Sequence, residues 1–259
     1  MSRKAILWAM ALVVIVPALI GGGYWIWWDQ VEKYAPVTLS NPDDVSAIQS
    51  MLDRVDYVSP NGPGNMATRW VYLIGYRNCA PCNAYQRSEF STLQAAGIDT
   101  RVVMFARPDD GAQKQSTPEE RSTVAELWLN RSWPLYLQWF NAPEGDWKAT
   151  GLPVTDDDMA RSGVVWASRE FVSELTPVLG RNRINTSYPL VIWRNANHQL
   201  RVCACASDKA YHFIREDFGV KGDLEQAAQN LIDLPGKLIN SATSTSAAPA
   251  NYGPDGQAQ

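Results

Sequence analysis

The sequence lacks several features that would place it at once in a large class of proteins. Apart from Arg3-Lys4 it has no run of basic residues, and its formal net charge is -4, so we expect no nucleic-acid partner. It has only two histidines, His198 and His212, and their spacing does not fit a metal site. It also lacks G-x-S-x-G, H-E-x-x-H and phosphate-loop motifs, which leaves hydrolase and nucleotide chemistry without support.

The N-terminal stretch sets the expected compartment. Residues 5–28 carry no charged side chain, and as a helix they can span a hydrocarbon core of about 30 Å. Arg3 and Lys4 precede this stretch, so the chain should start in the cytoplasm and its remainder should be exported. A signal peptide cleaved near residues 21–23 is the alternative. We favour a membrane anchor that comprises residues 1–28, because cleavage would leave an aromatic terminus in water. The expected location is the bacterial inner membrane, with the rest of the chain in the periplasm, where disulfides persist.

The next segments are interpreted as a stalk followed by an α/β domain. Residues 29–65 combine a short helix with a run of turn-forming residues, which is typical of a stalk, and residues 66–235 would form the domain. Short apolar runs at 70–76 and 101–106 are typical of buried strands, with a helix expected between them at 83–96. A helical connection between two strands predicts a parallel pair.

A helical insertion is expected at about residues 112–180. Its Trp-rich faces are interpreted as core packing, with a client-binding groove as the alternative. Runs at 184–194 and 199–205, separated by a polar turn, predict a β-hairpin. Another helix is expected around residues 223–234. Residues 241–259 are rich in Ser, Ala, Pro and Gly, a composition that predicts disorder.

The four cysteines form two close pairs, and the first lies where chemistry is expected. Cys79-Ala80-Pro81-Cys82 falls between a predicted strand and a predicted helix. Zinc sites use the same C-x-x-C spacing, but this placement puts Cys79 near the helix N-cap, where unpaired N–H groups and the helix dipole stabilise a thiolate. Cys82, one turn later, can resolve a mixed disulfide. Cys79 and Cys82 are therefore the predicted catalytic pair, and no cofactor or metal is expected.

The order of these elements resembles the thioredoxin fold. The helical insertion makes the chain more similar to the catalytic domains of periplasmic disulfide isomerases and oxidases, the Dsb family, and WVYLIGYRNCAPC and SYPLVIW carry the likeness most specifically. The resemblance implies a central mixed sheet flanked by helices, with a helical insertion, preceded here by a transmembrane helix. It also implies that Pro189 is a cis-proline beside the cysteine pair. The residues implied to contact substrate are Tyr188, Pro189, Ala80 and Pro81.

Two departures from the related families matter for mechanism. Thioredoxin has a buried acid six positions before its first cysteine, and this sequence has Leu73 there. Periplasmic isomerases have an N-terminal dimerisation domain, and here an anchor and a stalk are predicted in its place. Without a dimeric cleft, isomerisation of large misfolded clients is less expected.

The second pair, Cys203 and Cys205, lies on the second strand of the predicted hairpin. Alternate strand residues point to the same face, so the two sulfurs are neighbours. Three interpretations stay open: a second redox pair that exchanges electrons with Cys79 and Cys82, unpaired or structural cysteines, or ligands of a soft metal such as Cu(I) or Zn.

The favoured function is thiol–disulfide exchange on exported proteins that contain cysteines. Pro81 directly precedes the second cysteine, as in thioredoxin, which favours reduction or isomerisation over oxidation. A membrane redox partner is compatible with the anchor. The alternatives are a thioredoxin-like protein that handles copper or zinc through both cysteine motifs, and a non-catalytic component of an envelope secretion or conjugation assembly.

Overall fold

The structure, a computed structural model, describes residues 32–64, 67–143 and 145–222. The predicted anchor, the helix expected around 223–234 and the tail at 241–259 lie outside these residues. Among the described residues, none of the helices has the length and hydrophobicity that a membrane span requires.

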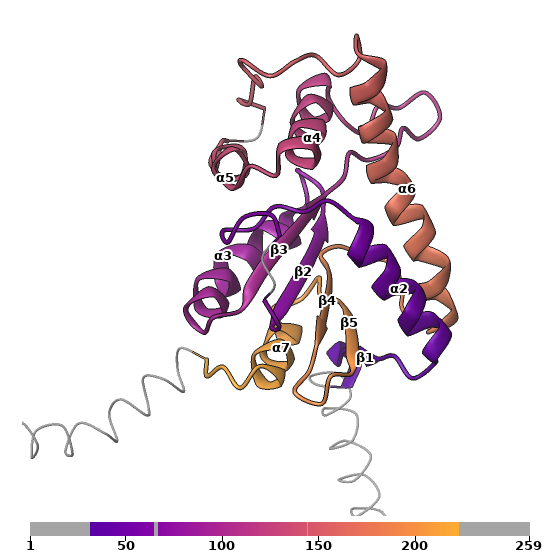
Figure 1. The fold of residues 1–259 in the computed structure, drawn as a ribbon, viewed down its shortest axis with the longest axis vertical. Coiled ribbons are helices and arrows are strands. Elements are labelled where there is room, and N and C mark those ends of the chain that lie inside the picture. The colour runs from indigo at the N-terminus through magenta and orange to yellow at the C-terminus, as the bar shows by residue number, and fades with distance from the viewer. Residues whose placement is uncertain (1–31, 65–66, 144, 223–259) are drawn as a thin grey trace, which may run out of the picture. The chain divides into compact units, whose positions relative to one another are not determined.

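A mixed sheet of five strands, in the order β1-β5-β4-β2-β3, carries the domain (Figure 1). The strands are β1 Val37–Thr38, β2 Trp70–Gly75, β3 Asp99–Met104, β4 Leu190–Arg194 and β5 Leu200–Ala204. As predicted, β2 and β3 are parallel and β4 and β5 form an antiparallel hairpin. The central strand β2 is buried from Val71 to Gly75, because helices cover both faces of the sheet.

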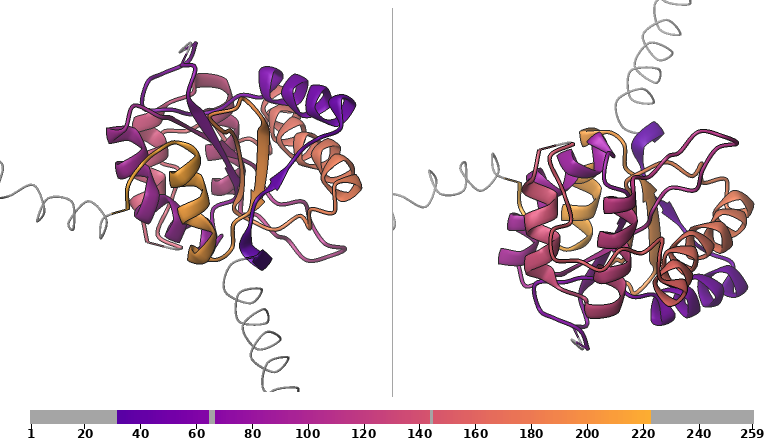
Figure 2. Two further views of the ribbon diagram at one scale, coloured as in Figure 1. Left: turned by 90° about the horizontal axis from the view of Figure 1, so that it is seen from below. Right: turned by 90° about the horizontal axis from the view of Figure 1, so that it is seen from above.

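The helices are arranged in two layers around this sheet. Figure 2 shows α3 and α7 on one face and α2 and α6 on the other. The α-helices are α2 Pro42–Arg54, α3 Ala80–Ala95, α4 Pro118–Asn130, α5 Trp133–Asn141, α6 Met159–Arg181 and α7 Tyr211–Asp217. Two short 3-10 helices, η1 Glu32–Tyr34 and η2 Asp208–Ala210, precede β1 and α7. This mixed sheet flanked by helices is the thioredoxin-like arrangement that the sequence resemblance implied.

The helical insertion comprises α4, α5 and α6. The first two of these helices are separated at Arg131, which has a positive φ of 50°. The Trp128 indole N–H donates to the Met104 carbonyl at 2.7 Å, which attaches α4 to the end of β3. Trp128 and Trp139 are buried, so the expected core packing holds for them, whereas Trp166 on α6 is 61% exposed.

Residues 37–58 differ from the predicted stalk, because they are built into the domain. Strand β1 pairs with β5, and Val58 forms an isolated bridge with Val102 in β3. Helix α2 buries Ile48 and Leu52 and packs against α6. An amphipathic helix with an apolar stripe gains free energy by covering the sheet, so this segment does not stand apart as a spacer.

Candidate functional site

The first cysteine pair forms a disulfide where β2 gives way to α3. Cys79 and Cys82 are bonded, with their Cα atoms 5.2 Å apart. Cys79 is the N-cap of α3, and its Sγ accepts a hydrogen bond from the Cys82 backbone N–H at 3.1 Å. Pro81 lies in the first turn, where a missing N–H costs no helical hydrogen bond. The predicted position of Cys79 at the helix start is therefore confirmed.

Cys82 packs directly on the last residue of β2. A Cβ placed on Gly75 would lie 2.9 Å from the Cys82 Sγ, a distance that real Cβ atoms essentially never show. A glycine is thus required at this position for the sulfur to sit against the sheet. Gly75 lies within the motif that carried the resemblance, but its role emerges only from the structure.

The disulfide is shielded in this oxidised state. Cys79 is 1% exposed and Cys82 5% exposed, whereas the neighbouring residues Asn78 and Ala80 are exposed. An attacking thiolate must approach a sulfur atom directly to displace the other. Exchange at Cys79 therefore requires the protein around it to open, which the sequence analysis did not anticipate.

The peptide bond between Tyr188 and Pro189 is cis, as the resemblance implied. Ile74 in β2 pairs with Leu190 in β4, so Pro189, one residue earlier, lies beside Gly75 and hence close to Cys82. The structure brings the cysteine pair and this proline to one end of the sheet.

Tyr188 belongs to a cluster of three aromatic rings at this end of the sheet. Its ring centroid lies 5.6 Å from that of Tyr76 and 5.0 Å from that of Phe105. Burial raises the pKa of Tyr188 to about 12. The residue implied to contact substrate is thus held by the domain's own packing.

A small cavity adjoins Cys82 on the side of the insertion. Its volume of about 10 Å³ is of the size that one water molecule needs. The Tyr136 hydroxyl on α5 donates to Gln86 on α3 across this region, and burial raises the pKa of Tyr136 well above its ordinary value. No residue that lines the cavity is an acid, and Leu73 occupies the position of the thioredoxin carboxylate.

Arg77 connects the cysteine loop to the insertion, a link that the sequence analysis missed. Its guanidinium donates to the backbone carbonyls of Phe140 and Ala142 at the end of α5. The same group lies over the Trp139 ring, 5.7 Å from the centroid. An arginine two residues before Cys79 gave no sequence signal for this contact, because its partners are more than 60 residues away.

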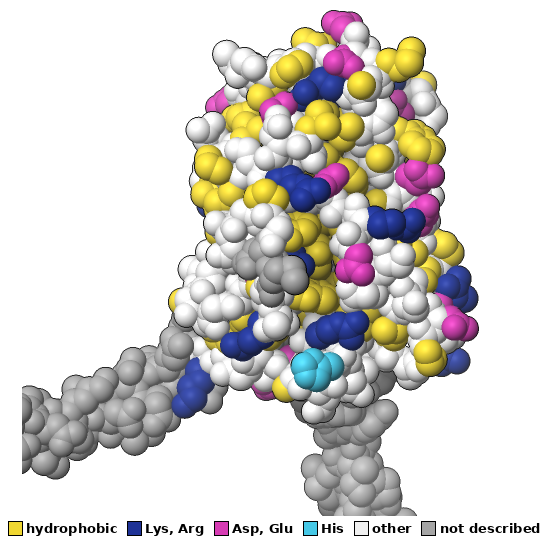
Figure 3. All heavy atoms as spheres, in the orientation of Figure 1, with side chains coloured by type: hydrophobic (Ala, Val, Ile, Leu, Met, Phe, Trp, Pro, Cys, Tyr) yellow, Lys and Arg dark blue, Asp and Glu magenta, His cyan; other side chains and the backbone are white. Residues whose placement is uncertain are grey.

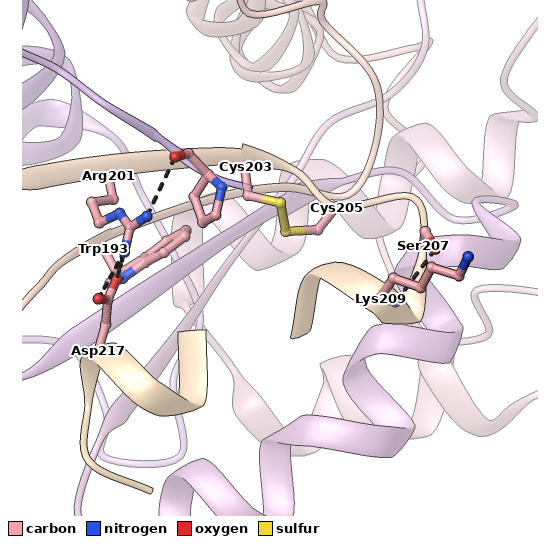
Figure 4. Close-up of a disulfide and its surroundings, with 8 residues drawn as sticks. Trp193, Arg201, Cys203, Cys205, Ser207, Lys209 and Asp217 are labelled. Carbon is pink, nitrogen blue, oxygen red and sulfur yellow. Dashed lines mark hydrogen bonds and ion pairs between the residues drawn. A yellow bond between two sulfur atoms is a disulfide. The ribbon is translucent and has the colours of Figure 1, made fainter. Parts of the chain in front are cut away.

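The second cysteine pair is also a disulfide, so these two cysteines are not free thiols in the oxidised protein. Cys203 and Cys205 are bonded, with their Cα atoms 5.1 Å apart (Figure 4). Cross-linking so short a loop stabilises a fold little: chain-entropy arithmetic gives roughly 1.6 kcal/mol, against roughly 3 kcal/mol for a loop of about 15 residues. Among the described residues, no group of three or more His, Cys, Asp or Glu side chains is arranged to hold a metal ion.

The two disulfides share one face of the sheet. Leu73 pairs with Val191, and Val191 pairs with Cys203. Directly paired residues of antiparallel strands point to the same side, so Cys203 points to the face where Cys82 packs on Gly75, two residues after Leu73.

These features define a class: a thioredoxin-fold protein with a C-x-x-C disulfide at a helix N-cap and a cis-proline on the neighbouring strand. The sequence matches no family model, and no curated protein matches it. A mutant of ScsC from Proteus mirabilis with a shortened linker is 12% identical, with 85% of this chain and 97% of that chain covered and a TM-score of 0.38. BcfH from Salmonella enterica Typhimurium is 13% identical, with 84% of this chain and 93% of that chain covered and a TM-score of 0.44.

Proposed function

We propose that this protein is a membrane-anchored thiol–disulfide oxidoreductase that acts on exported proteins in the bacterial periplasm. Cys79 is the nucleophile and Cys82 the resolving cysteine. No cofactor takes part, because both electrons reside in the dithiol. The observation that carries the proposal is the position of the Cys79 Sγ at the N-cap of α3, where it accepts the Cys82 N–H.

This hydrogen bond explains how reduced Cys79 would react. When the disulfide is open, the same N–H and the positive end of the 16-residue helix α3 face the Cys79 sulfur. Both favour the thiolate, which is the form that attacks disulfides. The thiolate attacks a client disulfide and joins one client sulfur to Cys79. Cys82 then attacks Cys79, which releases the reduced client and restores the Cys79–Cys82 bond.

The client would bind beside the cis-proline. Its extended chain would pair with the backbone at Tyr188 and Pro189, in the manner of an added strand, and would contact Ala80 and Pro81. Ala80 is exposed and Pro81 is half-buried, so both can meet a docked chain. Since Cys79 is shielded in the oxidised form, client binding must be coupled to opening of the loop around it.

Reduction or isomerisation is the favoured direction. Pro81 precedes the second cysteine, as in thioredoxin. After each turnover, a reductant must then reduce the Cys79–Cys82 disulfide again. A membrane protein with its own dithiol is the partner that an anchored enzyme would use.

The test is to trap the covalent intermediate. In the full chain, Cys82→Ala should accumulate a mixed disulfide between Cys79 and a disulfide-bonded client, because the resolving step is removed. Cys79→Ala/Cys82→Ala is the matched control and should trap nothing. The proposal fails if no adduct forms at Cys79, or if reduction of the client proceeds equally well in Cys79→Ser.

A non-catalytic role in an envelope assembly is the second candidate, and a surface feature favours it. The described residues include four large apolar side chains that are strongly exposed, and all lie in or beside the helices of the insertion: Leu129, Val154, Met159 and Trp166. Hydrophobic side chains reach the surface in the upper part of Figure 3, over this region. This candidate predicts that Cys79→Ser leaves all client disulfides unchanged.

A further inference from the structure

The Cys203–Cys205 disulfide lies next to the cis-proline, on the side away from Cys82. The Cys205 backbone N–H donates to the Pro189 carbonyl oxygen at 2.9 Å. Gly75, Pro189 and Cys205 thus follow one another across three neighbouring strand ends. Strands lie about 4.8 Å apart, so the backbone of Cys205 is roughly 10 Å from that of Gly75. Pro189 stands between the two disulfides, which separates their sulfurs.

The second disulfide bends the chain at the end of β5. Residues two apart in an extended strand have Cα atoms about 6.7 Å apart, whereas those of Cys203 and Cys205 are 5.1 Å apart. The Ala206 N–H donates to the Ala204 carbonyl at 2.9 Å, which closes a tight turn around Cys205. This bend presents the Cys205 N–H to Pro189.

The part of β5 before the bend is fixed by other contacts. Arg201 pairs with Asp217 on α7 at 2.7 Å, and the Trp193 indole donates to the same carboxylate (Figure 4). Val202 pairs with Val37 in β1. Opening the Cys203–Cys205 bond therefore cannot move residues 200–202 of the strand. The conformational change falls instead on the turn whose Cys205 N–H binds the Pro189 carbonyl.

We propose that Cys203–Cys205 is a second redox-active site, a disulfide that a dithiol reductant opens, and that its state controls client binding at Pro189. The control rests on the function proposed above for Cys79 and Cys82. When the bond is closed, the Cys205 N–H fixes the Pro189 carbonyl. When it is open, the end of β5 extends, this hydrogen bond weakens, and the strand edge that receives the client loses its fixed geometry.

The chemistry of opening is ordinary thiol–disulfide exchange. Both sulfurs are buried, so the turn must open locally, as at Cys79, before a thiolate of the reductant attacks Cys203, which is 5% exposed against 0% for Cys205. The sulfur–sulfur bond breaks, and Cys205 leaves as a thiolate and takes up a proton. The second thiol of the reductant then attacks the mixed disulfide and releases Cys203. Two electrons and two protons reach the protein, and the reductant becomes a disulfide.

The first test measures the second site alone. The full chain carrying Cys79→Ser/Cys82→Ser is equilibrated with glutathione buffers, in which two thiol molecules supply the two electrons of one dithiol, and thiols at positions 203 and 205 are counted by alkylation and peptide mass spectrometry. The pair should open in the folded protein. A pair that stays closed until denaturant unfolds the chain overturns the proposal, because structural disulfides resist the glutathione pool.

The second test measures the coupling to Pro189. In the same variant, amide hydrogen exchange in residues 203–206 should become at least tenfold faster on reduction. Residues 200–202 should change little, because their contacts are independent of the disulfide. Equal exchange rates in the oxidised and reduced forms would show that the turn does not respond, and would end the proposal.

The third test measures the effect on exchange with a client. Cys203→Ser/Cys205→Ser should lower kcat/KM at Cys79 about fivefold, the factor that one ordinary hydrogen bond contributes. Ala206→Ser keeps both sulfurs, lies exposed in the same turn, and should behave as wild type. An unchanged kcat/KM in the double variant refutes control of the client site. If wild type shows no exchange at all, the function proposed for Cys79 fails, and the first two tests still decide whether the second pair is redox-active.

Discussion

Gly75 determines how closely Cys82 approaches the sheet. Because the sulfur is held in a disulfide, it cannot move aside for a Cβ only 2.9 Å away. Gly75→Ala should lower the free energy of unfolding of the oxidised protein by about 1–3 kcal/mol, the usual cost of overpacking a core. Denaturant unfolding measures this change.

Gly163→Ala is the control for Gly75→Ala. Gly163 lies within α6, and a Cβ added to it would meet no other atom within 4 Å. Alanine is the better helix former there, so the substitution should stabilise the protein by about 0.5–1 kcal/mol. If Gly75→Ala is equally harmless, then Cys82 does not pack on the sheet as described.

At the residue scale, local features were predictable and shielding was not. Cys79 as the N-cap follows from a strand, a C-x-x-C motif and a helix in direct succession, since capping involves only neighbouring residues. The cis bond at Pro189 was predictable only through family resemblance. The 1% exposure of Cys79 depends on tertiary packing, which the sequence pattern around it does not encode.

Among the helices, α2 is fixed to α6 by a buried carboxylate. Asp44 is 4% exposed and accepts hydrogen bonds from Arg181, at 2.6 Å and 3.0 Å, and from the Asn182 amide at 2.8 Å. The hydrogen bonds from Arg181 and then Asn182 lower the pKa of Asp44 below its ordinary value. The folded state therefore prefers the ionised form, so this contact stabilises the fold above the ordinary carboxyl pKa of about 4 and loses that effect as the pH falls below it.

Asp44→Asn should consequently lower the melting temperature at pH 7. The difference from wild type should shrink as the pH falls below about 4, because Asp44 is then protonated in the unfolded chain before it is protonated in the folded protein. Thermal unfolding of both proteins between pH 7 and a pH below 4 measures this difference in melting temperature. Asp43→Asn, on the exposed side of the same helix, should show no comparable loss at pH 7. A deficit in Asp44→Asn that is constant with pH would mean that the charge of Asp44 plays no part.

The helix α2 also shows where prediction from sequence stops at the scale of elements. A short helix was predicted within residues 29–65, and the helix is present at Pro42–Arg54. The surface that this helix covers was not predictable, because an apolar stripe shows that a helix is packed but does not identify the element it packs against. Strand β1 has only two residues, Val37 and Thr38, too few for a periodic pattern. The helix α2 and the strand β1 were therefore both assigned to a stalk.

For the whole molecule, the parallel β2–β3 pair and the β4–β5 hairpin could be anticipated because successive elements restrict one another, whereas β1 at the edge of the sheet was not predicted. A strand, a helix and a parallel strand, followed by a hairpin, leave few arrangements of the sheet. The insertion between β3 and β4 was predictable as helical, and it comprises α4, α5 and α6. Two contacts attach the insertion to the rest of the domain: Arg77 binds the end of α5, and Trp128 binds Met104. Neither contact was predictable, since each joins segments that are distant in sequence.

The predicted anchor makes a testable claim about the molecule in the cell. The full chain should remain in the membrane fraction after alkaline carbonate and should dissolve only in detergent, because residues 1–28 can span the bilayer. Both disulfides should be present in this material, whereas a chain expressed without residues 1–28 should stay in the cytosol with four free thiols. Arg3→Glu/Lys4→Glu, which reverses the flanking charge, should reduce correct insertion. A soluble periplasmic protein shortened at its N-terminus would instead establish the cleaved signal peptide, and the protein would then diffuse freely in the periplasm.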